Sequence, residues 1–419
     1  MKMSDFEKLG IDEDFNSYYV EQGIKRPNEV QTKVIPKIME EKSIICLAQT
    51  GSGKTLSYAL PISEKIKLHE DENGLQEEVG RPFAVVVVPT KELANQIRGV
   101  FKGLSHHVGL RVRAMLGGTK GKSASLKDQS YEILIATPNR LAKALKNKEV
   151  TFDNLKWLVF DEADQLFDMG FKKDIEGMTR FVEYDDTTIS FFSATLPVEV
   201  EEFIKGQFKK KNLELVSFKE GHKVQQKVET YNVFLSPKEK LNMLKEFLSK
   251  TAAGRGIVFA NQKNQVDEIQ KYVDQELPKL KYRVLHGDLT QQERAANHKA
   301  FVDGKAQVLI ATDIAARGID IKDLAWVLNF GLPKTAVYYL HRCGRVGRGG
   351  KKGVVYNFVT NFDAKLIGHI NDAIKNQSQL DLEFIAKDIK SQRSKPKPKA
   401  KAKQKQKKKK ITKRTKRYG

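Results

Sequence analysis

Cysteine is scarce in this chain of 419 residues, which has two, Cys46 and Cys343, far apart in the sequence. Two distant cysteines exclude a disulfide framework and a zinc ribbon built from cysteines, and they fit a reducing compartment such as the cytosol. Long apolar runs are also missing, because no stretch approaches the roughly 20 uncharged residues that a membrane-spanning helix needs. The amino terminus has no apolar segment of the kind that secretory signals carry. We therefore expect a cytoplasmic protein without a membrane anchor.

Acidic residues are absent from one long segment, Arg393–Gly419, which carries 15 lysines and arginines. The whole chain has a net charge of +22, so the residues before this segment carry +7. Both values favour a polyanionic partner, with nucleic acid favoured over anionic lipid. After Ser391 the sequence is rich in Lys, Pro and Gln and nearly free of apolar side chains. Residues 392–419 are therefore predicted to form a disordered basic tail.

The rest of the chain contains short apolar runs, each followed by a turn signal and then by a segment with helical periodicity. These runs are nearly continuous in β-branched and aromatic residues, as is typical of parallel strands buried on both faces. Strands that alternate with helices in this way predict doubly wound α/β domains. The first series of runs lies at 43–48, 84–89, 111–116, 131–137, 155–164 and 188–195, and the second at 255–261, 282–288, 306–313, 324–331 and 353–359.

The strand pattern pauses between residues 209 and 223. We therefore predict a first domain over 1–210, a linker over 211–223 and a second domain over 224–391. The acidic segment HEDENGLQEEVG at 69–80 has no periodicity and is predicted to be a solvated loop.

A phosphate-binding loop is predicted where the run SIICL leads into AQTGSGKT at 48–55. A strand, a glycine-rich turn and a helix start let backbone N–H groups converge on phosphate oxygens, and the helix dipole favours the anion. In this interpretation Lys54 holds the β- and γ-phosphates and Thr55 ligates Mg²⁺. The loop is a variant, because Ala48 stands where the usual pattern begins with glycine. The alternative is a glycine-rich turn with an exposed lysine.

Four residues with the letters DEAD, Asp161–Asp164, follow the apolar run LKWLVF. Acidic groups at the carboxyl end of a parallel strand lie in the crevice where such sheets bind ligands. Asp161 would hold Mg²⁺ through water, and Glu162 would orient and deprotonate the attacking water. By itself the string also fits the solvated start of a helix. The phosphate-binding loop upstream favours the nucleotide site.

With these motifs the chain resembles the DEAD-box ATP-dependent RNA helicases of helicase superfamily 2, of the bacterial type. The resemblance extends over about residues 6–360 and implies two tandem RecA-like domains, with ATP and RNA bound across the cleft between them. The remaining segments that carry it are GIKRPNEVQ (23–31), PTKELA (89–94), Gly117–Gly118, TPNR (137–140), SAT (193–195), IVFAN (257–261), HGDLTQQER (286–294), ATDIAARGID (311–320) and HRCGRVGR (341–348).

The resemblance implies a role for each residue at the nucleotide. Gln31 reads the adenine edge, Ile24 takes the place of a stacking aromatic residue, and Asp320 contacts the ribose. Arg345 and Arg348 act as arginine fingers, because a planar guanidinium stabilises charge spread over phosphate oxygens. The expected catalytic residues are Lys54, Asp161, Glu162, Arg345 and Arg348, and the expected metal ligands are Thr55 and Asp161. The expected nucleotide-binding residues are Phe6, Ile24, Gln31, Ala48, Gln49, Thr50, Gly51, Ser52, Gly53, Lys54, Thr55, Asp320, Arg345 and Arg348.

Two further groups of residues follow from the resemblance. Coupling residues connect the state of ATP to the RNA face, and among them His341 and Arg342 brace the DEAD segment. RNA contacts from glycine turns, threonine hydroxyls and arginines suit recognition of phosphate and 2′-OH groups without base readout. The coupling residues are Asp164, Ser193, Thr195, His341 and Arg342. The RNA-binding residues are Pro89, Thr90, Gly118, Thr137, Arg140, Gly287, Arg294 and Thr312.

These expectations combine into an RNA-stimulated ATPase that uses ATP and Mg²⁺ to separate short RNA duplexes or to remodel RNA–protein particles. We expect a monomer in the cytoplasm, with RNA bound irrespective of sequence and with ribosomal particles or the RNA-decay machinery as partners. Two alternatives remain open, a helicase that translocates on DNA and an ATP-gated RNA clamp with little turnover. The tail is expected to tether RNA through phosphates, and a nuclear address is the alternative.

Overall fold

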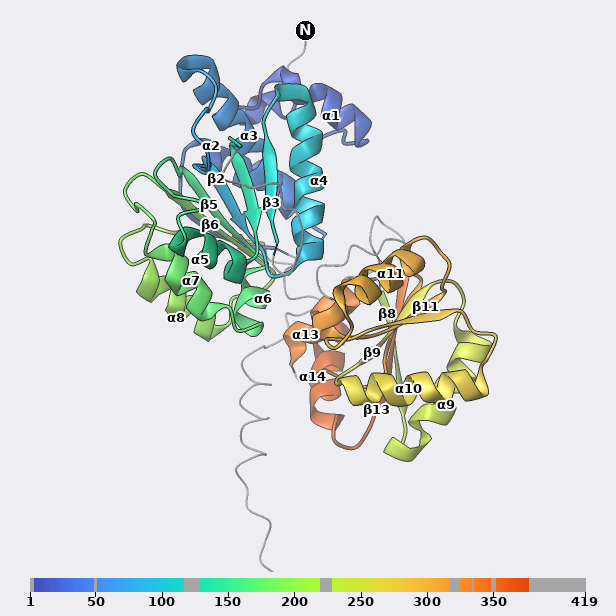
Figure 1. Ribbon diagram of the computed structural model, residues 1–419. Helices are drawn as coiled ribbons and strands as arrows, with labels where there is room; N and C mark the ends of the chain where they lie inside the picture. Colours follow the sequence, from blue (N-terminus) through green and yellow to red (C-terminus); the bar gives the residue numbers. More distant parts are fainter. Residues whose placement is uncertain are drawn as a thin grey trace, which may run out of the picture.

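The computed structural model describes residues 4–48, 51–116, 129–218, 228–316, 324–333, 335–347 and 352–376. They form two parallel sheets with flanking helices, and Figure 1 shows the two units side by side. The fold class predicted from the sequence, two doubly wound parallel-sheet domains in tandem, is therefore confirmed. The predicted basic tail, residues 392–419, lies outside the described residues.

The first sheet has the order β3-β4-β2-β5-β6-β1-β7, and all of its strand pairs are parallel. Its strands are β1 (Ile44–Leu47), β2 (Ala84–Val87), β3 (Val112–Met115), β4 (Ile133–Ala136), β5 (Trp157–Asp161), β6 (Thr188–Ser193) and β7 (Glu214–Ser217). Its helices are α1 (Asn16–Glu21), α2 (Glu29–Met39), α3 (Lys54–Asn73), α4 (Lys91–Val108), α5 (Pro138–Lys146), α6 (Ala163–Asp168), α7 (Lys172–Thr179) and α8 (Val198–Gln207), with 3₁₀ turns at Glu7–Leu9 and Glu13–Phe15.

The second sheet has the order β10-β11-β9-β12-β13-β8 and is also parallel. Its strands are β8 (Val228–Phe234), β9 (Gly256–Ala260), β10 (Tyr282–Leu285), β11 (Val308–Thr312), β12 (Trp326–Asn329) and β13 (Gly353–Val359). Its helices are α9 (Lys240–Glu246), α10 (Lys263–Glu276), α11 (Gln291–Val302), α12 (Asp313–Ala316), α13 (Ala336–Cys343) and α14 (Ala364–Lys375), with a 3₁₀ turn at Pro237–Glu239 and a π turn at Phe247–Thr251.

Each sheet is covered by an apolar core on both faces, which is why its central strands are apolar throughout. In the first domain Leu60 and Phe101 belong to the core on one face, and Leu141 and Phe203 to the core on the other. In the second domain the two cores are formed in the same way, by α11, α13 and α14 on one face and by α9 and α10 on the other. Because both faces of each sheet are packed, the ends of its strands are held in fixed positions.

Two sequence predictions need correction. The predicted linker contains β7, which pairs with β1 in the first sheet. This short edge strand buries only Val216 and exposes its other residues, so it lacks the buried apolar run that marks the central strands. The predicted loop over 69–80 begins inside α3, which continues to Asn73 and ends at Gly74, where φ is +85°. An ion pair between Lys67 and Asp71, one turn apart and 2.7 Å long, supports that last helical stretch.

Parallel strands bring all of their carboxyl ends to one edge of a sheet, and the predicted motifs follow these ends. In the first domain the glycine-rich loop follows β1, the DEAD segment begins at the last residue of β5, and the SAT segment begins at the last residue of β6. Pro89 and Thr137 follow β2 and β4 in the same way. The topology therefore collects residues that are far apart in the sequence along one edge.

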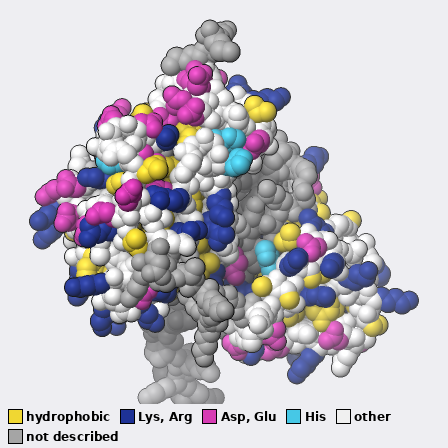
Figure 2. Space-filling model, turned by 45° about the horizontal axis from the view of Figure 1, so that its top comes forward, with side chains coloured by type: hydrophobic (Ala, Val, Ile, Leu, Met, Phe, Trp, Pro, Cys, Tyr) yellow, Lys and Arg dark blue, Asp and Glu magenta, His cyan; other side chains and the backbone are white. Residues whose placement is uncertain are grey.

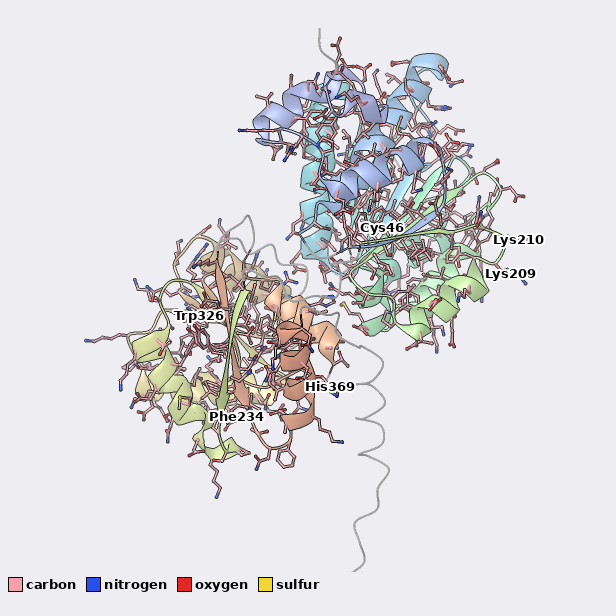
Figure 3. All side chains as sticks on the ribbon, turned by 180° about the vertical axis from the view of Figure 1, so that it is seen from behind. Cys46, Lys209, Lys210, Phe234, Trp326 and His369 are labelled. Carbon is pink, nitrogen blue, oxygen red and sulfur yellow. The ribbon has the colours of Figure 1, made fainter. Side chains whose placement is uncertain are left out.

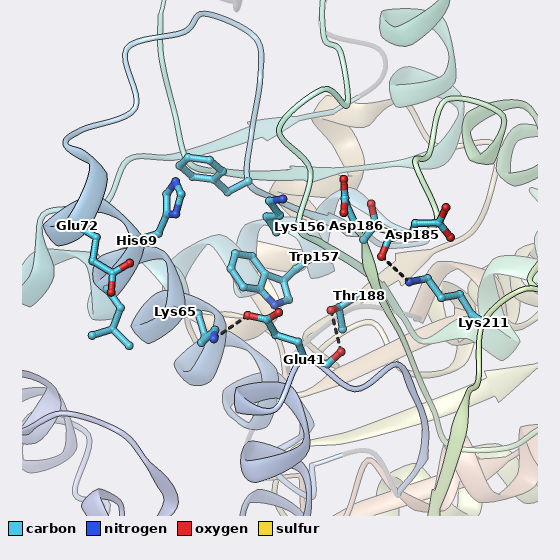
Figure 4. A pocket seen from close by; sticks show the side chains of 13 residues that line it. Glu41, Lys65, His69, Glu72, Lys156, Trp157, Asp185, Asp186, Thr188 and Lys211 are labelled. Atoms are coloured by element: carbon cyan, nitrogen blue, oxygen red, sulfur yellow. Dashed lines mark hydrogen bonds and ion pairs between the residues drawn. The ribbon is translucent and has the colours of Figure 1, made fainter.

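A cavity of about 560 Å³ opens at the opposite, amino-terminal edge of the first sheet (Figure 4). Trp157, Thr188 and Glu41 line it, together with Lys65, which pairs with Glu41 at 2.7 Å. None of the predicted site residues lines this cavity. It is therefore separate from the edge that carries the motifs. No helix among the described residues is both long and apolar enough to cross a membrane.

The two thiols are predicted to be unreactive in the folded protein. Cys46 lies inside the first domain (Figure 3) and Cys343 is buried in the second, and burial raises the pKa of each thiol to about 12. At pH 8 about one thiol in 10,000 would be a thiolate, against about a quarter at the usual pKa of 8.5. Labelling with a chromogenic disulfide should be very slow without denaturant and should reach two thiols per chain in guanidinium chloride. Fast labelling of the native protein would contradict the buried placement.

Candidate functional site

The glycine-rich loop connects β1 to the start of α3. Gly51 and Gly53 both have positive φ, +80° and +85°, a region that L-residues rarely adopt. A Cβ atom at Gly53 would also lie 2.5 Å from Nδ2 of Asn28 and 2.9 Å from Nε2 of Gln31. Backbone conformation and close approach therefore both require glycine at position 53. Two predicted loop residues, Gln49 and Thr50, lie outside the described residues.

The segment before α2 is fastened to this loop. Asn28 and Gln31 form a capping box, in which each side chain accepts a hydrogen bond of 3.0 Å from the backbone N–H of the other. The Asn28 amide also donates to the backbone oxygen of Ser52 at 3.0 Å. Gln31, expected to read adenine, therefore lies beside the loop. A cavity of about 410 Å³ between α1 and α4 is lined in part by Thr55.

Two residues predicted to lie near the adenine, Phe6 and Ile24, pack against the core of the first domain. Ile24 is partly buried and packs against the same core as Phe6. Phe6 stacks on Tyr19 with ring centroids 4.1 Å apart and keeps only 3% of its surface exposed. The contact of Phe6 with the nucleotide stays a prediction. The sequence near Phe6 did not indicate its stacking partner, since Tyr19 lies on α1.

Lys54 is buried among carboxylates at the start of α3. Its ammonium donates to the backbone oxygen of Ala48 at 2.8 Å and lies 3.8 Å from Oε1 of Glu162. Burial by itself lowers the pKa of Lys54, but the charges of Glu162 and Asp161 outweigh burial and raise that pKa above its usual value. The lysine is therefore a permanent cation at the edge where the loop and the DEAD segment meet.

Asp161 is held by two donors from two different elements. Its Oδ1 accepts a hydrogen bond of 2.8 Å from the backbone N–H of Glu162, and its Oδ2 accepts one of 2.8 Å from the Tyr58 hydroxyl. Burial and the neighbouring Glu162 charge raise the pKa of Asp161 to about 6, against the smaller effect of Lys54. A buried carboxylate in a fixed orientation, with its charge only partly balanced, is suited to a cation.

Glu162 adopts a strained backbone conformation, with φ +52° and ψ +52° at the position before α6. Such left-handed residues other than glycine cluster at functional sites, where the surrounding structure fixes them. The Glu162 carboxylate accepts a hydrogen bond of 2.9 Å from the Gln165 amide, and the side chain is 12% exposed. The strain and the Gln165 amide together aim a carboxylate at Lys54.

Asp164 connects the DEAD segment to the SAT segment. Its Oδ2 accepts hydrogen bonds from the Thr195 hydroxyl at 2.8 Å and from the Thr195 backbone N–H at 3.2 Å, and its own N–H donates to Ser193 Oγ at 3.0 Å. Burial would raise the pKa of Asp164, but the nearby His341 and the Thr195 hydroxyl outweigh burial and lower it. The buried aspartate is therefore ionised and ties two strand ends together.

Contacts between described side chains join the two domains. His341 of α13 lies 3.6 Å from Oδ2 of Asp164, and the Tyr338 hydroxyl donates to Asp168 of α6 at 2.9 Å. Farther along the interface, Arg294 of α11 lies 3.6 Å from Glu92 of α4. Figure 1 shows α13 and α11 on the side of the second domain that faces the first. The second domain thus reaches the same carboxylate that binds the SAT segment.

Comparisons with known proteins agree with this arrangement. The family described as DEAD/DEAH box helicase matches residues 28–203, and the helicase conserved C-terminal domain matches residues 239–350. The ATP-dependent RNA helicase CshA of Listeria monocytogenes is 33% identical over 379 residues, which are 90% of this chain and 70% of that protein. The chain belongs to the DEAD-box ATP-dependent RNA helicases.

Other relatives of this DEAD-box chain are longer. DEAD-box ATP-dependent RNA helicase 24 of Arabidopsis thaliana is 36% identical over 372 residues, which are 88% of this chain and 48% of the relative. The chain therefore spans about half the length of that relative. Among solved structures, Dbp5 of S. cerevisiae bound to RNA and ADP BeF3 is 25% identical, with a TM-score of 0.75, over 89% of this chain and 93% of that one.

The DEAD-box chain has a donor set that fits magnesium. Among the described residues, no cluster of three or more His, Cys, Asp or Glu side chains forms a closed metal cage. Mg²⁺ usually takes one or two protein ligands and completes its octahedron with water and substrate phosphates. The buried Asp161 carboxylate, together with Thr55 of the glycine-rich loop, fits that pattern. Thr55 and Asp161 would hold the ion, and the ion would neutralise phosphate charge.

Arg342 does not brace the DEAD segment, and that prediction needs correction. Its guanidinium points into its own domain, where it bonds Asp313 at 2.6 and 2.7 Å. It also donates to Asn329 at 2.8 Å, to the Gly331 backbone oxygen at 2.7 Å and to Asn261 at 2.9 Å. Five donors in a planar fork suit this set of acceptors, which includes β12 and the end of β9. His341, one position earlier on α13, faces the first domain instead.

Of the two predicted arginine fingers and the predicted ribose contact, only Arg345 lies among the described residues. Arg345 is buried, with 8% of its surface exposed, just beyond α13, and it makes contacts within the structure. Arg348 and Asp320 lie outside the described residues. The roles of all three stay predictions.

Most predicted RNA-binding residues of this DEAD-box chain lie at carboxyl ends of strands. Thr90 caps α4 by accepting a hydrogen bond of 3.2 Å from the Leu93 N–H, and Arg140 pairs with Glu149. Arg294 faces Glu92, as described above. The remaining predicted residues are Pro89 after β2, Thr137 after β4, Gly287 after β10 and Thr312 at the end of β11, while Gly118 lies outside the described residues.

Three residues of the site were missed by sequence reasoning. Tyr58 contacts Asp161, Gln165 contacts Glu162, and Tyr338 contacts Asp168 across the domains. For the first two a local signal existed, because Tyr58 lies one helical turn after Thr55 and Gln165 lies three residues after Glu162. For Tyr338 no local signal existed, since its partner belongs to the other domain.

Arg342 should be a stability residue of the second domain. Arg342→Met leaves Asp313, Asn329 and Asn261 short of donors and should lower the free energy of unfolding of that domain by about 3 kcal/mol. Each domain contains one tryptophan, so Trp326 reports on the second domain when Trp157 is replaced by Phe. Denaturant unfolding followed by Trp326 fluorescence measures the change. Arg283→Met, at an exposed arginine on β10, is the control and should change stability little.

Proposed function

We propose that this DEAD-box chain hydrolyses ATP in response to RNA and uses the cycle to open short RNA duplexes or to remodel RNA–protein particles. The observation that carries the proposal is the set of Lys54, Asp161 and Glu162, of which the first two are buried, at the carboxyl edge of the first sheet. Relatives named ATP-dependent RNA helicase and a neighbour solved with RNA and ADP BeF3 support the choice of RNA and ATP.

In the proposed mechanism each residue does one task. Lys54 leaves the Ala48 carbonyl and binds the β- and γ-phosphates, and backbone N–H groups of the loop surround them. Glu162, aimed by Gln165, orients the attacking water and accepts its proton. Bound Mg²⁺ supplies charge neutralisation for the phosphates. Arg345 and Arg348 stabilise the charge that spreads over the γ-phosphate oxygens in the transition state.

Coupling to RNA rests on Asp164. This carboxylate accepts a hydrogen bond from the SAT threonine in the first domain and faces His341 of the second. Its contacts therefore depend on both strand ends and on the position of the other domain. We propose that a bound RNA strand stabilises the arrangement in which α13 and α6 meet, and thereby completes the hydrolytic site. Threonine hydroxyls and arginines at the edge bind the RNA backbone, which makes the binding independent of sequence.

Surface charge supports a modest contribution of the two domains to RNA affinity. On the face shown in Figure 2, lysine and arginine side chains lie on both domains and are interspersed with Asp and Glu. This agrees with the net charge of +7 for the sequence before the tail. The tail as an RNA tether, the monomeric state, the cytoplasmic location and the ribosomal or RNA-decay partners stay predictions. They follow from the resemblance and the composition.

RNA should stimulate phosphate release much more than DNA of the same sequence. The reason is that 2′-OH groups distinguish the two strands where backbone contacts dominate. Steady-state phosphate release is measured with no nucleic acid, with RNA and with DNA. Equal stimulation by DNA would favour the DNA helicase, and slow release at saturating RNA would favour the clamp.

Glu162→Gln should lower the RNA-stimulated rate of phosphate release by about 100-fold or more while RNA and ATP still bind. The control Glu199→Gln, at an exposed position on α8, should behave like the parent.

Arg345→Lys should separate nucleotide binding from turnover. Lysine keeps the charge but loses the planar fork, so the RNA-stimulated rate should fall by about 100-fold or more. Affinity for ADP should stay within a few-fold of the parent, because the P-loop belongs to the first domain. Phosphate release and fluorescent ADP titration measure the two quantities. An unchanged rate would remove Arg345 from the hydrolytic site.

A further inference from the structure

Tyr58 contacts one of the two side chains that the resemblance assigns to magnesium. Its hydroxyl donates to Oδ2 of Asp161 at 2.8 Å, and the residue lies one turn after Thr55 on α3. The tyrosine is fully buried, with its ring against Phe192 and Phe101 at centroid distances of 4.8 and 6.3 Å. Burial and the Asp161 charge raise the pKa of Tyr58 well above its usual value, so the hydroxyl remains protonated.

We propose that Tyr58 is a positioning residue that orients Asp161 and tunes the affinity of the site for the magnesium–nucleotide complex. The inference rests on the proposed nucleotide function. Asp161 is a carboxylate that the resemblance expects to hold the ion, and the Tyr58 hydroxyl is one of the two donors that orient it.

The arrangement also fixes the direction of the Asp161 lone pairs. With the Glu162 N–H on Oδ1 and the Tyr58 hydroxyl on Oδ2, the carboxylate cannot turn without breaking a bond of 2.8 Å. Outer partners of this kind orient ligands, and their removal typically lowers metal affinity by about 10- to 100-fold. Without the hydroxyl, Asp161 would lose one of its two donors.

Tyr58→Phe removes one oxygen and keeps the ring that packs against Phe192 and Phe101, so the fold should be preserved. The matched control is Tyr131→Phe. Tyr131 is a fully buried tyrosine of the same domain, and its hydroxyl has no hydrogen-bond partner among the described residues. Any effect of removing a buried hydroxyl as such therefore appears in the control as well. Thermal unfolding of the full chain checks that both variants are folded.

The decisive measurement is binding of fluorescent ADP with and without magnesium. In the parent, Mg²⁺ should strengthen ADP binding, and in Tyr58→Phe this strengthening should fall by about 10-fold or more, while the affinity in EDTA stays unchanged. The Mg²⁺ concentration for half-maximal ATP hydrolysis should rise by a similar factor, with the rate at saturating Mg²⁺ changed little. Tyr131→Phe should match the parent in every measurement.

Two results would overturn the inference. If Tyr58→Phe depends on Mg²⁺ as the parent does, the hydroxyl does not act on the metal ligands. If ADP binding falls equally in EDTA and in Mg²⁺, Tyr58 has a general packing role. Because the main readout is ADP binding, it remains informative even if RNA fails to stimulate hydrolysis, which would instead contradict the proposed function.

Discussion

The mutual neutralisation of buried charges at one edge of the first sheet is the interaction on which the rest of the structure depends. Lys54, Asp161 and Asp164 are buried at the ends of β1 and β5, where an unpaired charge would cost several kcal/mol. Each has found partners within the protein. The lysine bonds a backbone carbonyl, Asp161 accepts from Tyr58, and Asp164 accepts from Thr195. Parallel strand ends make this possible, since they bring residues from 54 to 195 to one line.

The same edge contains two residues with positive φ that belong to the predicted site. Gly53 has positive φ against the Asn28 and Gln31 side chains, and Glu162 has positive φ at the start of α6. Such conformations persist because rigid elements with a core on both sheet faces hold them. A loose scaffold would relax Glu162 and move its carboxylate away from Lys54. The packing of the two cores is therefore needed both for the stability of the domain and for the orientation of the side chains at the site.

The second domain is built on a comparable principle, with a different consequence. Arg342 satisfies acceptors from three segments of its own sheet edge, so it fixes the frame from which His341 and Tyr338 reach the first domain. Neighbouring residues on one short helix thus have opposite tasks. One face of α13 holds its domain together, and the other contacts α6. This division makes the interdomain contact dependent on the packing behind it.

The sequence by itself determined the class of fold, two parallel-sheet domains, because apolar runs and turn signals are local patterns. It also indicated Lys54, Asp161 and Glu162, since each follows a strand in a recognisable motif. The tertiary structure alone decided that Phe6 is core, that Arg342 faces inward, that β7 joins the first sheet and that Tyr58 reaches Asp161 across 103 residues of sequence. The physical reason is that the direction of a side chain and the identity of a distant partner depend on how elements pack, and periodicity carries no record of that packing.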